Sequence, residues 1–457
     1  MSAPSVDRGQ WSGKLGFILA AAGSAIGLGN IWRFPYTAGE NGGGAFVLIY
    51  LGFVALIGVP VLLAELAIGR KTQRNPVGAF KALTESKFWP MVGGLGVLTG
   101  FGILAFYSVV AGWTLGYLYM SLTGGLAGVT EAGASAAVFT NLVTDPVWAI
   151  VLAGAFLLLT ILVVRGGISG GIERATKILM PLLFVIMLIL VIRAMTLPGA
   201  GAGISYLFKP DFSKITTTVV MSALGQALFS LSLGMGAMIT YGSYLPEKEN
   251  MPFAGVSVAF FDTLIAIMAG LIIFPALFAT GGDPSGGPGL VFVVLPTIFN
   301  AMPAGNFFAV AFYALLAIAA LTSTISLLEV VVSYFVDERG WRRDKAAWTI
   351  GGLCFLLAVP SALSQGAVAE LGTGGLFSWD FLTLNNNIWG NYSLSLGAIL
   401  ISVFVGWKWG IPSALASLEA SGDRLPAAGL WGFLIRYVCP VVILILLIFI
   451  VATGTYF

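Results

Sequence analysis

One apolar segment of the sequence is interrupted by residues that could hold a charged ligand. The segment FILAAAGSAIGLGNIWRFPY (17–36) begins as an ordinary membrane helix and then meets several glycines, Asn30 and Arg33. A break in a helix frees backbone carbonyl and N–H groups, which are tolerated at membrane depth only where they line a cavity or meet a ligand. Freed carbonyls suit a small hard cation, and the positive N-terminal end of a half-helix suits a carboxylate. One site of this kind could hold both sodium and an amino acid.

A second apolar segment has the same character. In GQALFSLSLGMGAMITYGSY (225–244), Ser230 and Ser232 stand close to two glycines. Paired glycines lower helix propensity by about 1 kcal/mol each, and serine hydroxyls compete for backbone hydrogen bonds. The alternative is that the glycines only allow close helix packing. That alternative explains neither the polar residues nor the matching positions of the two breaks.

The composition places these segments in a membrane protein. Of the 457 residues, 58% are hydrophobic and 9% are charged, and the mean hydropathy is +0.97. Soluble domains carry about 25% charged residues. The net charge of +2 gives no indication of nucleic-acid binding, and the absence of histidine excludes imidazole metal sites, histidine proton relays and Ser–His catalysis. We therefore expect an all-α integral membrane protein that is not an enzyme.

About eleven apolar runs are long enough to span a bilayer. They lie at 15–38, 44–69, 90–123, 146–164, 177–195, 217–244, 253–280, 305–336, 346–365, 389–410 and 430–454. The interrupted runs are the first and the sixth, which suggests two five-helix halves, and because five is odd the second half would insert upside down. We expect one transmembrane domain, 1–457, with a first repeat (15–195), a second repeat (217–410) and an eleventh helix (430–454).

Basic residues indicate the orientation of these spans. Most Lys and Arg follow the even-numbered spans, so the positive-inside rule places the N-terminus in the cytoplasm and, for eleven spans, the C-terminus outside. The basic tail before the first run also resembles a signal peptide, but the interruption that follows favours a functional helix.

At these residues the sequence resembles the neurotransmitter:sodium symporter family, which has the LeuT fold. The motifs GSAIGLGNIWRFPY, ENGGGAF (40–46), WTLGY (113–117), SLSLGMGAMITYGSY and LTST (321–324) occur in the order and spacing of that family. The resemblance extends through the tenth helix and weakens between about 365 and 395. It implies an alternating-access symporter that couples sodium to amino acids, of the bacterial amino-acid branch, in the plasma (bacterial inner) membrane.

The resemblance implies two sodium sites. The first would use the carbonyl of Ala25, the side chains of Asn30 and Asp262, the backbone and hydroxyl of Ser230, and the substrate carboxylate. The second would use the carbonyls of Gly23, Ile26 and Ala319 and the hydroxyls of Thr322 and Ser323. The last three residues share a helix face at i, i+3 and i+4, although the hydroxyls could instead bond to their own helix. A carboxylate in an apolar helix, such as Asp262, is functional by default, the alternative being a water-lined helix end.

A mostly apolar substrate pocket also follows from the resemblance. Tyr107 would donate to the substrate carboxylate, the alternative being core packing. The lining would be Ser24, Ala25, Gly27, Leu28, Gly29, Ile103, Tyr107, Phe229, Ser230, Ser232, Met235, Ser323 and Leu327. Monoamine-carrying relatives have an aspartate at the position of Gly27. We therefore expect apolar L-amino acids to bind, and their decarboxylated amines not to bind.

The resemblance also implies gates on both sides of the pocket. Outside, Arg33 would pair with an acid, best assigned to Asp380, and Phe229 would cap the pocket. Inside, Arg8 would pair with Asp337 while Trp11 plugs the pathway near Tyr244. The alternatives are a snorkelling Arg33 and two solvated loop charges at Arg8 and Asp337. The role of Glu329, where relatives often have glutamine, is open.

Asp262 also bears on chloride. Chloride-dependent relatives have asparagine at this position and usually serine at the position of Ala266. A fixed carboxylate beside sodium supplies the charge that chloride would bring, so we expect chloride-independent transport. The competing explanation is that Asp262 is protonated in part of the cycle.

Two other classes of function compete with the symporter. One is an ion channel and the other is an amino-acid receptor that does not transport. The expected partners are an amino acid, sodium and the lipid bilayer, without nucleic acid, and the sequence leaves the oligomeric state open.

Overall fold

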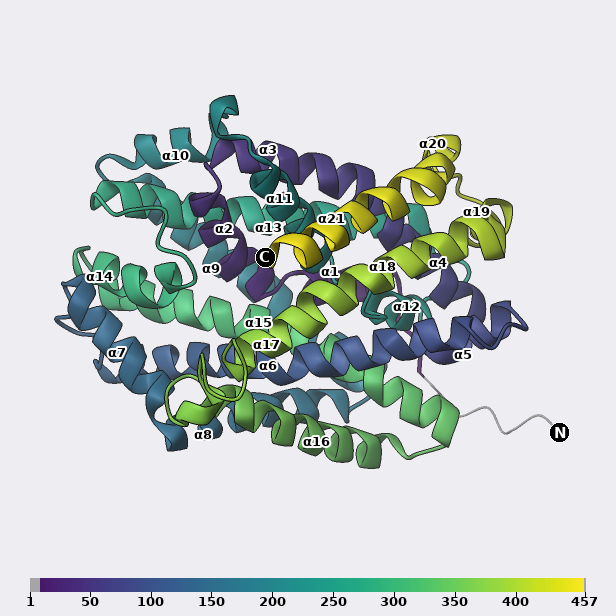
Figure 1. Cartoon of the computed structure of the whole chain (residues 1–457), viewed down its shortest axis with the longest axis horizontal. Coiled ribbons are helices and arrows are strands. Elements are labelled where there is room, and N and C mark those ends of the chain that lie inside the picture. Colours follow the sequence, from purple (N-terminus) through teal and green to yellow (C-terminus); the bar gives the residue numbers. More distant parts are fainter. Residues whose placement is uncertain (1–8, 456–457) are drawn as a thin grey trace.

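The computed structural model describes residues 9–455, and within this range it contains helices and connecting loops but no β-strand. The longest helices run along the long axis of the molecule, with α6 (Trp89–Thr123) and α15 (Gly305–Arg339) crossing its middle (Figure 1). Both of these helices have 35 residues, more than the 20 or so that a bilayer needs.

Nine helical stretches in the described range are long and apolar enough to cross a membrane. They are α3–η2–α4 (Gly44–Thr72), α6, α8 (Pro146–Val164), η3–α9 (Ile168–Met195), α13 (Met251–Ala279), α15, α16 (Arg343–Leu363), α17–η7–α18–η8–α19 (Phe381–Leu418) and α20–η9–α21 (Ala428–Thr453). The bent first span raises the number to ten in the described range. The sixth predicted run contains only shorter helices, so its crossing of the membrane, and with it the number eleven, stays a prediction.

The first span breaks as predicted. Helix α1 (Lys14–Ala25) ends where Ile26 turns to an extended backbone, and the chain resumes as the π-helical turn η1 (Gly29–Arg33) and α2 (Phe34–Glu40). The two halves meet at an angle of 50°.

The sixth span is unwound between α11 (Thr217–Ser230) and α12 (Ala237–Gly242). Ser232, Gly234 and Gly236 have left-handed backbones, with φ of 54°, 76° and 75°. Such values are cheap for glycine and uncommon for serine, so the break follows from the local sequence. A β-carbon at Gly234 would also come within 2.2 Å of the Leu394 carbonyl oxygen, because the unwound segment lies against α18 (Leu394–Val403).

Two spans differ from the predicted boundaries. The fifth begins at Ile168 rather than 177, because Glu173, Arg174 and Lys177 lie inside its first turns; the Lys177 Nζ is 2.7 Å from the Glu173 carboxylate. The tenth begins at Phe381, where the Asp380 side chain accepts a hydrogen bond from the Thr383 N–H and caps the helix.

Short helices connect the spans, and the hydropathy pattern did not predict them. They are α5 (Pro76–Leu83), α7 (Ala132–Thr144), α10 (Ala200–Phe208), η4 (Phe212–Lys214), η5–α14 (Leu290–Asn300) and η6 (Ala369–Leu371). The boundaries of the two five-helix repeats stay a prediction.

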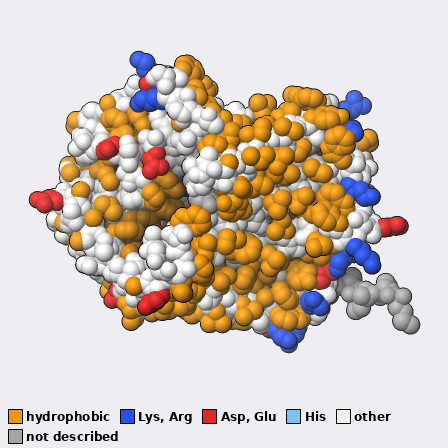
Figure 2. Space-filling model, viewed as in Figure 1, with side chains coloured by type: hydrophobic (Ala, Val, Ile, Leu, Met, Phe, Trp, Pro, Cys, Tyr) orange, Lys and Arg blue, Asp and Glu red, His pale blue; other side chains and the backbone are white. Residues whose placement is uncertain are grey.

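The surface agrees with a bilayer environment. Hydrophobic side chains cover a broad middle zone in Figure 2, and most of the visible Lys and Arg gather at the right-hand end. Lys71, Lys87 and Lys345 belong to connections that the charge pattern places in the cytoplasm, and all three are exposed.

Candidate functional site

The two broken helices meet at a buried polar cluster around Asp262. The Asn30 Nδ2 donates to the Asp262 Oδ1 at 2.7 Å, and the Ser230 hydroxyl donates to the two carboxylate oxygens at 2.9 and 2.8 Å. All three side chains are at most 1% exposed. No Lys or Arg among residues 9–455 forms an ion pair with Asp262. The carboxylate is thus held by neutral hydrogen-bond donors alone.

Two further side chains close this cluster. The Tyr50 hydroxyl lies 3.4 Å from both the Ser230 hydroxyl and the Asp262 Oδ2, a long contact. The Gln226 Nε2 donates to the Gly29 carbonyl at 2.7 Å, which ties α11 to the start of η1.

A second oxygen-rich group lies where α15 passes the end of α1. The Ser323 hydroxyl is 3.2 Å from the Ser24 carbonyl and 3.3 Å from the Ile26 carbonyl. The Thr322 hydroxyl is 3.4 Å from the Ile26 carbonyl and 3.0 Å from the Ala319 carbonyl of its own helix. Gly23 adjoins this group, since a β-carbon there would come within 3.3 Å of the Thr322 Cβ. The residues expected at the second sodium site therefore lie together.

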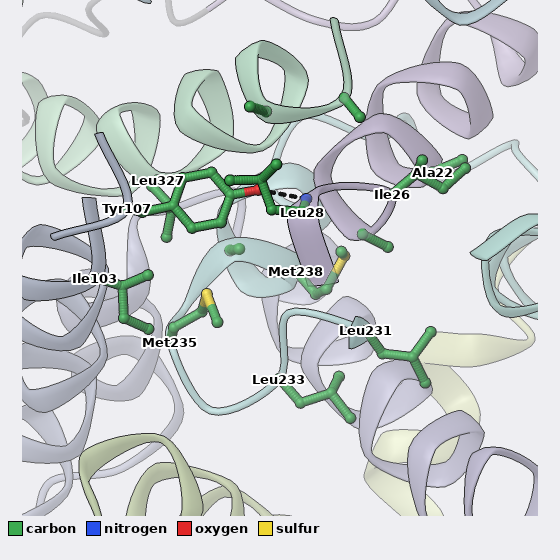
Figure 3. Packing of buried hydrophobic residues seen from close by; sticks show 14 of the residues in the cluster. Ala22, Ile26, Leu28, Ile103, Tyr107, Leu231, Leu233, Met235, Met238 and Leu327 are labelled. Atoms are coloured by element: carbon green, nitrogen blue, oxygen red, sulfur yellow. Dashed lines mark hydrogen bonds between the residues drawn. The ribbon is translucent and has the colours of Figure 1, made fainter. Parts of the chain in front are cut away.

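Between these clusters lies a small cavity of about 20 Å³. All of the expected lining residues except Leu28 and Ser230 surround it. Tyr107, on α6, points to the break in the first span and accepts a hydrogen bond from the Leu28 N–H at 2.7 Å (Figure 3). Ile103, Met235 and Leu327 lie on the same side of the break. The cavity is thus apolar on one side and edged by hydroxyls on the other.

No side chain fits at Gly27 as the structure stands. A β-carbon at this residue would lie 2.3 Å from the Ser323 Oγ and 2.6 Å from the Tyr107 hydroxyl oxygen. The backbone of Gly27 therefore approaches both hydroxyls closely, and its N–H donates to the Asn30 Oδ1 at 3.0 Å.

A cleft of about 510 Å³ leads toward this cavity from the end of the molecule opposite the basic loops. Gly29, Tyr107 and Phe229 line both spaces, so they separate the cleft from the cavity. The Arg33 guanidinium lies over the Phe229 ring, 4.4 Å from its centroid.

The structure does not pair Arg33 with Asp380. No ion pair joins them in the part of the chain that the structure describes. Asp380 instead accepts hydrogen bonds from the Gln365 Nε2 at 2.8 Å and from the Thr383 hydroxyl at 2.7 Å.

On the opposite side, Trp11 is buried against α12. Its indole N–H donates to the Tyr241 carbonyl at 3.0 Å, its backbone N–H donates to the Tyr244 carbonyl at 3.2 Å, and its ring packs edge-on against the Tyr244 ring at 6.1 Å. Asp337 accepts hydrogen bonds from the Asn75 backbone N–H and side chain at 2.9 and 3.1 Å. Arg8, its expected partner, lies outside the described residues.

Comparisons with known proteins decide the family. The sequence model of the sodium:neurotransmitter symporter family matches residues 8–134 and 142–456. The chain belongs to this family. A sodium-dependent transporter of Bacillus subtilis, YhdH, is 39% identical over 95% of this chain and 96% of its own length. A sodium-dependent transporter of Haemophilus influenzae is 37% identical over 98% and 99% of the two chains.

A solved structure extends the likeness to the fold. MhsT in complex with L-phenylalanine superposes with a TM-score of 0.88 at 46% identity, covering 96% of this chain and 99% of MhsT. This member of the sodium:neurotransmitter symporter family is therefore a multi-pass, sodium-dependent transporter with the LeuT fold, and not an enzyme.

One ion-pair network of this symporter was missed by the sequence reasoning. The buried Glu329 carboxylate forms an ion pair with the Arg343 guanidinium and accepts a hydrogen bond from the Tyr244 hydroxyl at 2.7 Å. Arg343 also donates to the Val164 carbonyl at 2.9 Å. Glu329 was recognisable as an unusual acid in an apolar helix, but its partner stands 14 residues further on, in the next helix.

Glu65 is a second acid without an assigned role in the sequence analysis. It is fully buried, and its Oε1 accepts a hydrogen bond from the Gly234 N–H at 2.7 Å. The carboxylate therefore supports the unwound segment of the sixth span.

Proposed function

We propose that this transporter carries apolar L-amino acids with sodium, by alternating access and without chloride. The observation that carries the proposal is the buried Asp262 carboxylate, which stands at both helix breaks and forms no ion pair with a cationic side chain of residues 9–455. An unpaired buried carboxylate is costly unless a cation compensates its charge. A sodium ion that enters with the substrate is such a cation.

The residues around Asp262 fit a hard monovalent cation. Carboxylate, hydroxyl, amide and carbonyl oxygens are the ligands that such ions prefer. Asn30 presents its amide nitrogen to Asp262, so ligation through its Oδ1 requires the carboxamide to turn. Thr322 and Ser323, with the carbonyl of Ile26, provide the oxygens of a second proposed site.

The substrate class follows from the surroundings of Gly27 and Tyr107. The Tyr107 hydroxyl and the freed backbone N–H groups suit a carboxylate, and no aspartate occupies position 27 to bind an amine. The MhsT structure contains L-phenylalanine. A cavity of about 20 Å³ admits about one water molecule, so we infer that side chains such as Met235 and Phe229 move when a substrate enters.

The proposed chloride independence rests on the negative charge of the Asp262 carboxylate. Asp262 supplies a negative charge within the cluster of Tyr50, Gln226 and Ser230, and Ala266 offers no hydroxyl. Two anions packed there would repel by several kcal/mol at about 4 Å and a low effective dielectric. The competing explanation, a carboxyl that is protonated in part of the cycle, also predicts transport without chloride.

The proposed orientation places the N-terminus and the basic loops in the cytoplasm of a bacterial inner membrane, with the C-terminus outside. The cleft above Phe229 then faces outward, and Trp11 lies on the cytoplasmic side.

Uptake into proteoliposomes tests the substrate class. We expect an inward sodium gradient to drive accumulation of radiolabelled L-phenylalanine, and unlabelled apolar L-amino acids to compete with it. Phenethylamine and tryptamine should not compete. Strong competition by tryptamine together with none from any apolar amino acid would reject the substrate class.

The same assay separates the other classes of function. A channel would carry sodium current without saturable dependence on the amino acid, and a receptor would bind the amino acid without accumulating it.

A further inference from the structure

An apolar groove of about 510 Å³ is lined mainly by residues of α6, α15 and α16, and none of its lining residues lines the substrate cavity. Its lining contains no charged residue and includes Met91, Gly94 and Leu98 of α6, Val331 and Phe335 of α15, and Leu353 of α16. The three helices run side by side in the lower part of Figure 1.

The groove opens on the lipid-facing surface. Met91, Leu98 and Leu353 are 68%, 56% and 49% exposed, and each belongs to a helix that is long and apolar enough to cross the membrane. In a bilayer this surface meets hydrocarbon rather than water. An acyl chain fills such a groove at no cost in desolvation, whereas water would leave its hydrogen bonds unmade.

Basic side chains flank one end of the groove. Lys345 lies 4.8 Å from the centroid of the Trp341 ring, and that ring packs at 4.7 Å against Phe335, which lines the groove. Lys87 stands three residues before Pro90, another lining residue. Neither lysine forms an ion pair with a carboxylate in residues 9–455. Both are exposed at the end that the charge pattern places in the cytoplasm.

We propose that this groove binds one anionic phospholipid of the cytoplasmic leaflet. An acyl chain lies along Gly94 and Leu98, between α6 and α15, and the phosphate-bearing head group meets Lys87 and Lys345. Anionic head groups attract exposed Lys and Arg at the membrane surface. The aromatic ring of Trp341 stands at the level where indoles favour the interface.

The site adjoins helices that carry the transport residues. Helix α6 carries Tyr107 and Ile103, and α15 carries Thr322 and Ser323, all within a few turns of the groove. A lipid wedged between these helices therefore contacts the elements that hold the substrate cavity, from their opposite side.

Gly94 offers a direct way to block the groove. A β-carbon at Gly94 has no neighbour within 4 Å, so a side chain there enters open space. Gly52, on the lipid-facing α3 (Gly44–Phe53), also has no neighbour within 4 Å and serves as a matched control. Both changes remove a helix glycine, so their effect on helix propensity is the same.

The test is native mass spectrometry of the intact, detergent-solubilised protein with phosphatidylglycerol or phosphatidylcholine added. We expect the unmodified chain to retain one phosphatidylglycerol more strongly than phosphatidylcholine. Gly94→Phe should weaken retention of both lipids by about tenfold, which corresponds to the loss of about two buried CH₂ groups of the acyl chain. Gly52→Phe should retain both lipids like the unmodified chain.

A separate pair of variants tests the contact between the lysines and the head group. The Lys87→Gln, Lys345→Gln double variant should lower phosphatidylglycerol retention to the level of phosphatidylcholine. The control pair, Lys71→Gln with Lys248→Gln, removes the same charge elsewhere and should change nothing.

Several outcomes would overturn the proposal. One is equal lipid retention by Gly94→Phe and Gly52→Phe, and another is equal retention by the two lysine double variants. A dimer that Gly94→Phe dissociates would assign the groove to a second copy of the chain. Sodium-dependent phenylalanine binding serves as the check of folding. If Gly94→Phe abolishes this binding, the smaller change Gly94→Leu takes its place.

Discussion

Two hydroxyls of α15 allow a direct test of the second proposed sodium site at the scale of single residues. Thr322 and Ser323 face the end of α1, where the carbonyls of Ser24 and Ile26 leave the helical pattern. Thr324, the next residue, instead contacts the Thr160 hydroxyl of α8 at 2.8 Å. Neighbouring hydroxyls of one helix thus point to different partners.

The double variant Thr322→Ala, Ser323→Ala removes two oxygens from the proposed site. We expect the sodium concentration for half-maximal uptake to rise by about a hundredfold, because each of the two lost charge-assisted contacts contributes about 1.5 kcal/mol, or about tenfold. The measurement is uptake as a function of sodium concentration. Thr324→Ala is the control and should not change the dependence of uptake on sodium concentration. An unchanged sodium dependence in the double variant would reject the second sodium site.

Some of these site residues could be predicted from the sequence and others could not. Asn30 and Asp262 could be singled out because polar groups in apolar helices are rare. Thr322 and Ser323 were implied by the family resemblance, because their spacing on one helix face left open that the hydroxyls bond to their own helix. The partner of Asp380 could not be predicted. Whether it reaches Arg33 depends on the path of a Gly- and Ser-rich loop, and in the structure Asp380 caps its own helix.

At the scale of helices, three contacts between elements hold the side that we propose faces the cytoplasm. One is the Trp11 indole against α12, and another is the Glu329–Arg343 ion pair, which joins α15 to the start of α16. Glu173 adds a third, since the Ser12 backbone N–H donates to its carboxylate at 2.9 Å and Lys177 pairs with it.

Trp11→Ala should loosen the contact with α12 and favour states that open toward the cytoplasm. Aromatic packing of this kind contributes about 1.4 kcal/mol, equivalent to about a tenfold shift in population. The measurement is the rate at which a maleimide labels an engineered Ser243→Cys, since the native cysteines are buried. In a chain that carries Trp11→Phe, the engineered cysteine should be labelled slowly, as in the parent chain. Equal rates for the alanine and parent chains would mean that Trp11 does not close the pathway.

Glu329→Gln should destabilise the transporter by about 3 kcal/mol, because the Arg343 guanidinium would then lack its buried counter-ion. The readout is thermal unfolding of the purified protein. The double variant Glu329→Gln, Arg343→Gln should lose less stability than the two single variants together. Strict additivity would show that the ion pair does not couple the two helices.

The helices themselves were mostly predictable, because long apolar runs and glycine-rich breaks leave strong patterns. The start of the fifth span was placed too late, since charged residues look like a loop until their pairing is known. Short helices such as α7 and α10 were missed because runs of 13 and 9 residues resemble the loops around them.

At the scale of the whole molecule, transport needs the charge of each state to balance. In the proposed cycle, sodium and an amino acid enter together, and we propose that Asp262 is the fixed negative charge that meets the cation. The family and its sodium dependence follow from the comparisons, whereas the proposed role of Asp262 is supported by its burial, its neutral hydrogen-bond donors and the absence of an ion pair in residues 9–455.

The measurement that tests this role most directly is sodium-driven phenylalanine uptake into proteoliposomes with gluconate in place of chloride. We predict that the parent chain transports at the same rate in both anions. Asp262→Asn should lose most of its uptake in gluconate and recover it at least in part when chloride is added. A large loss of rate for the parent chain in gluconate would contradict the proposal that Asp262 is the built-in counter-charge.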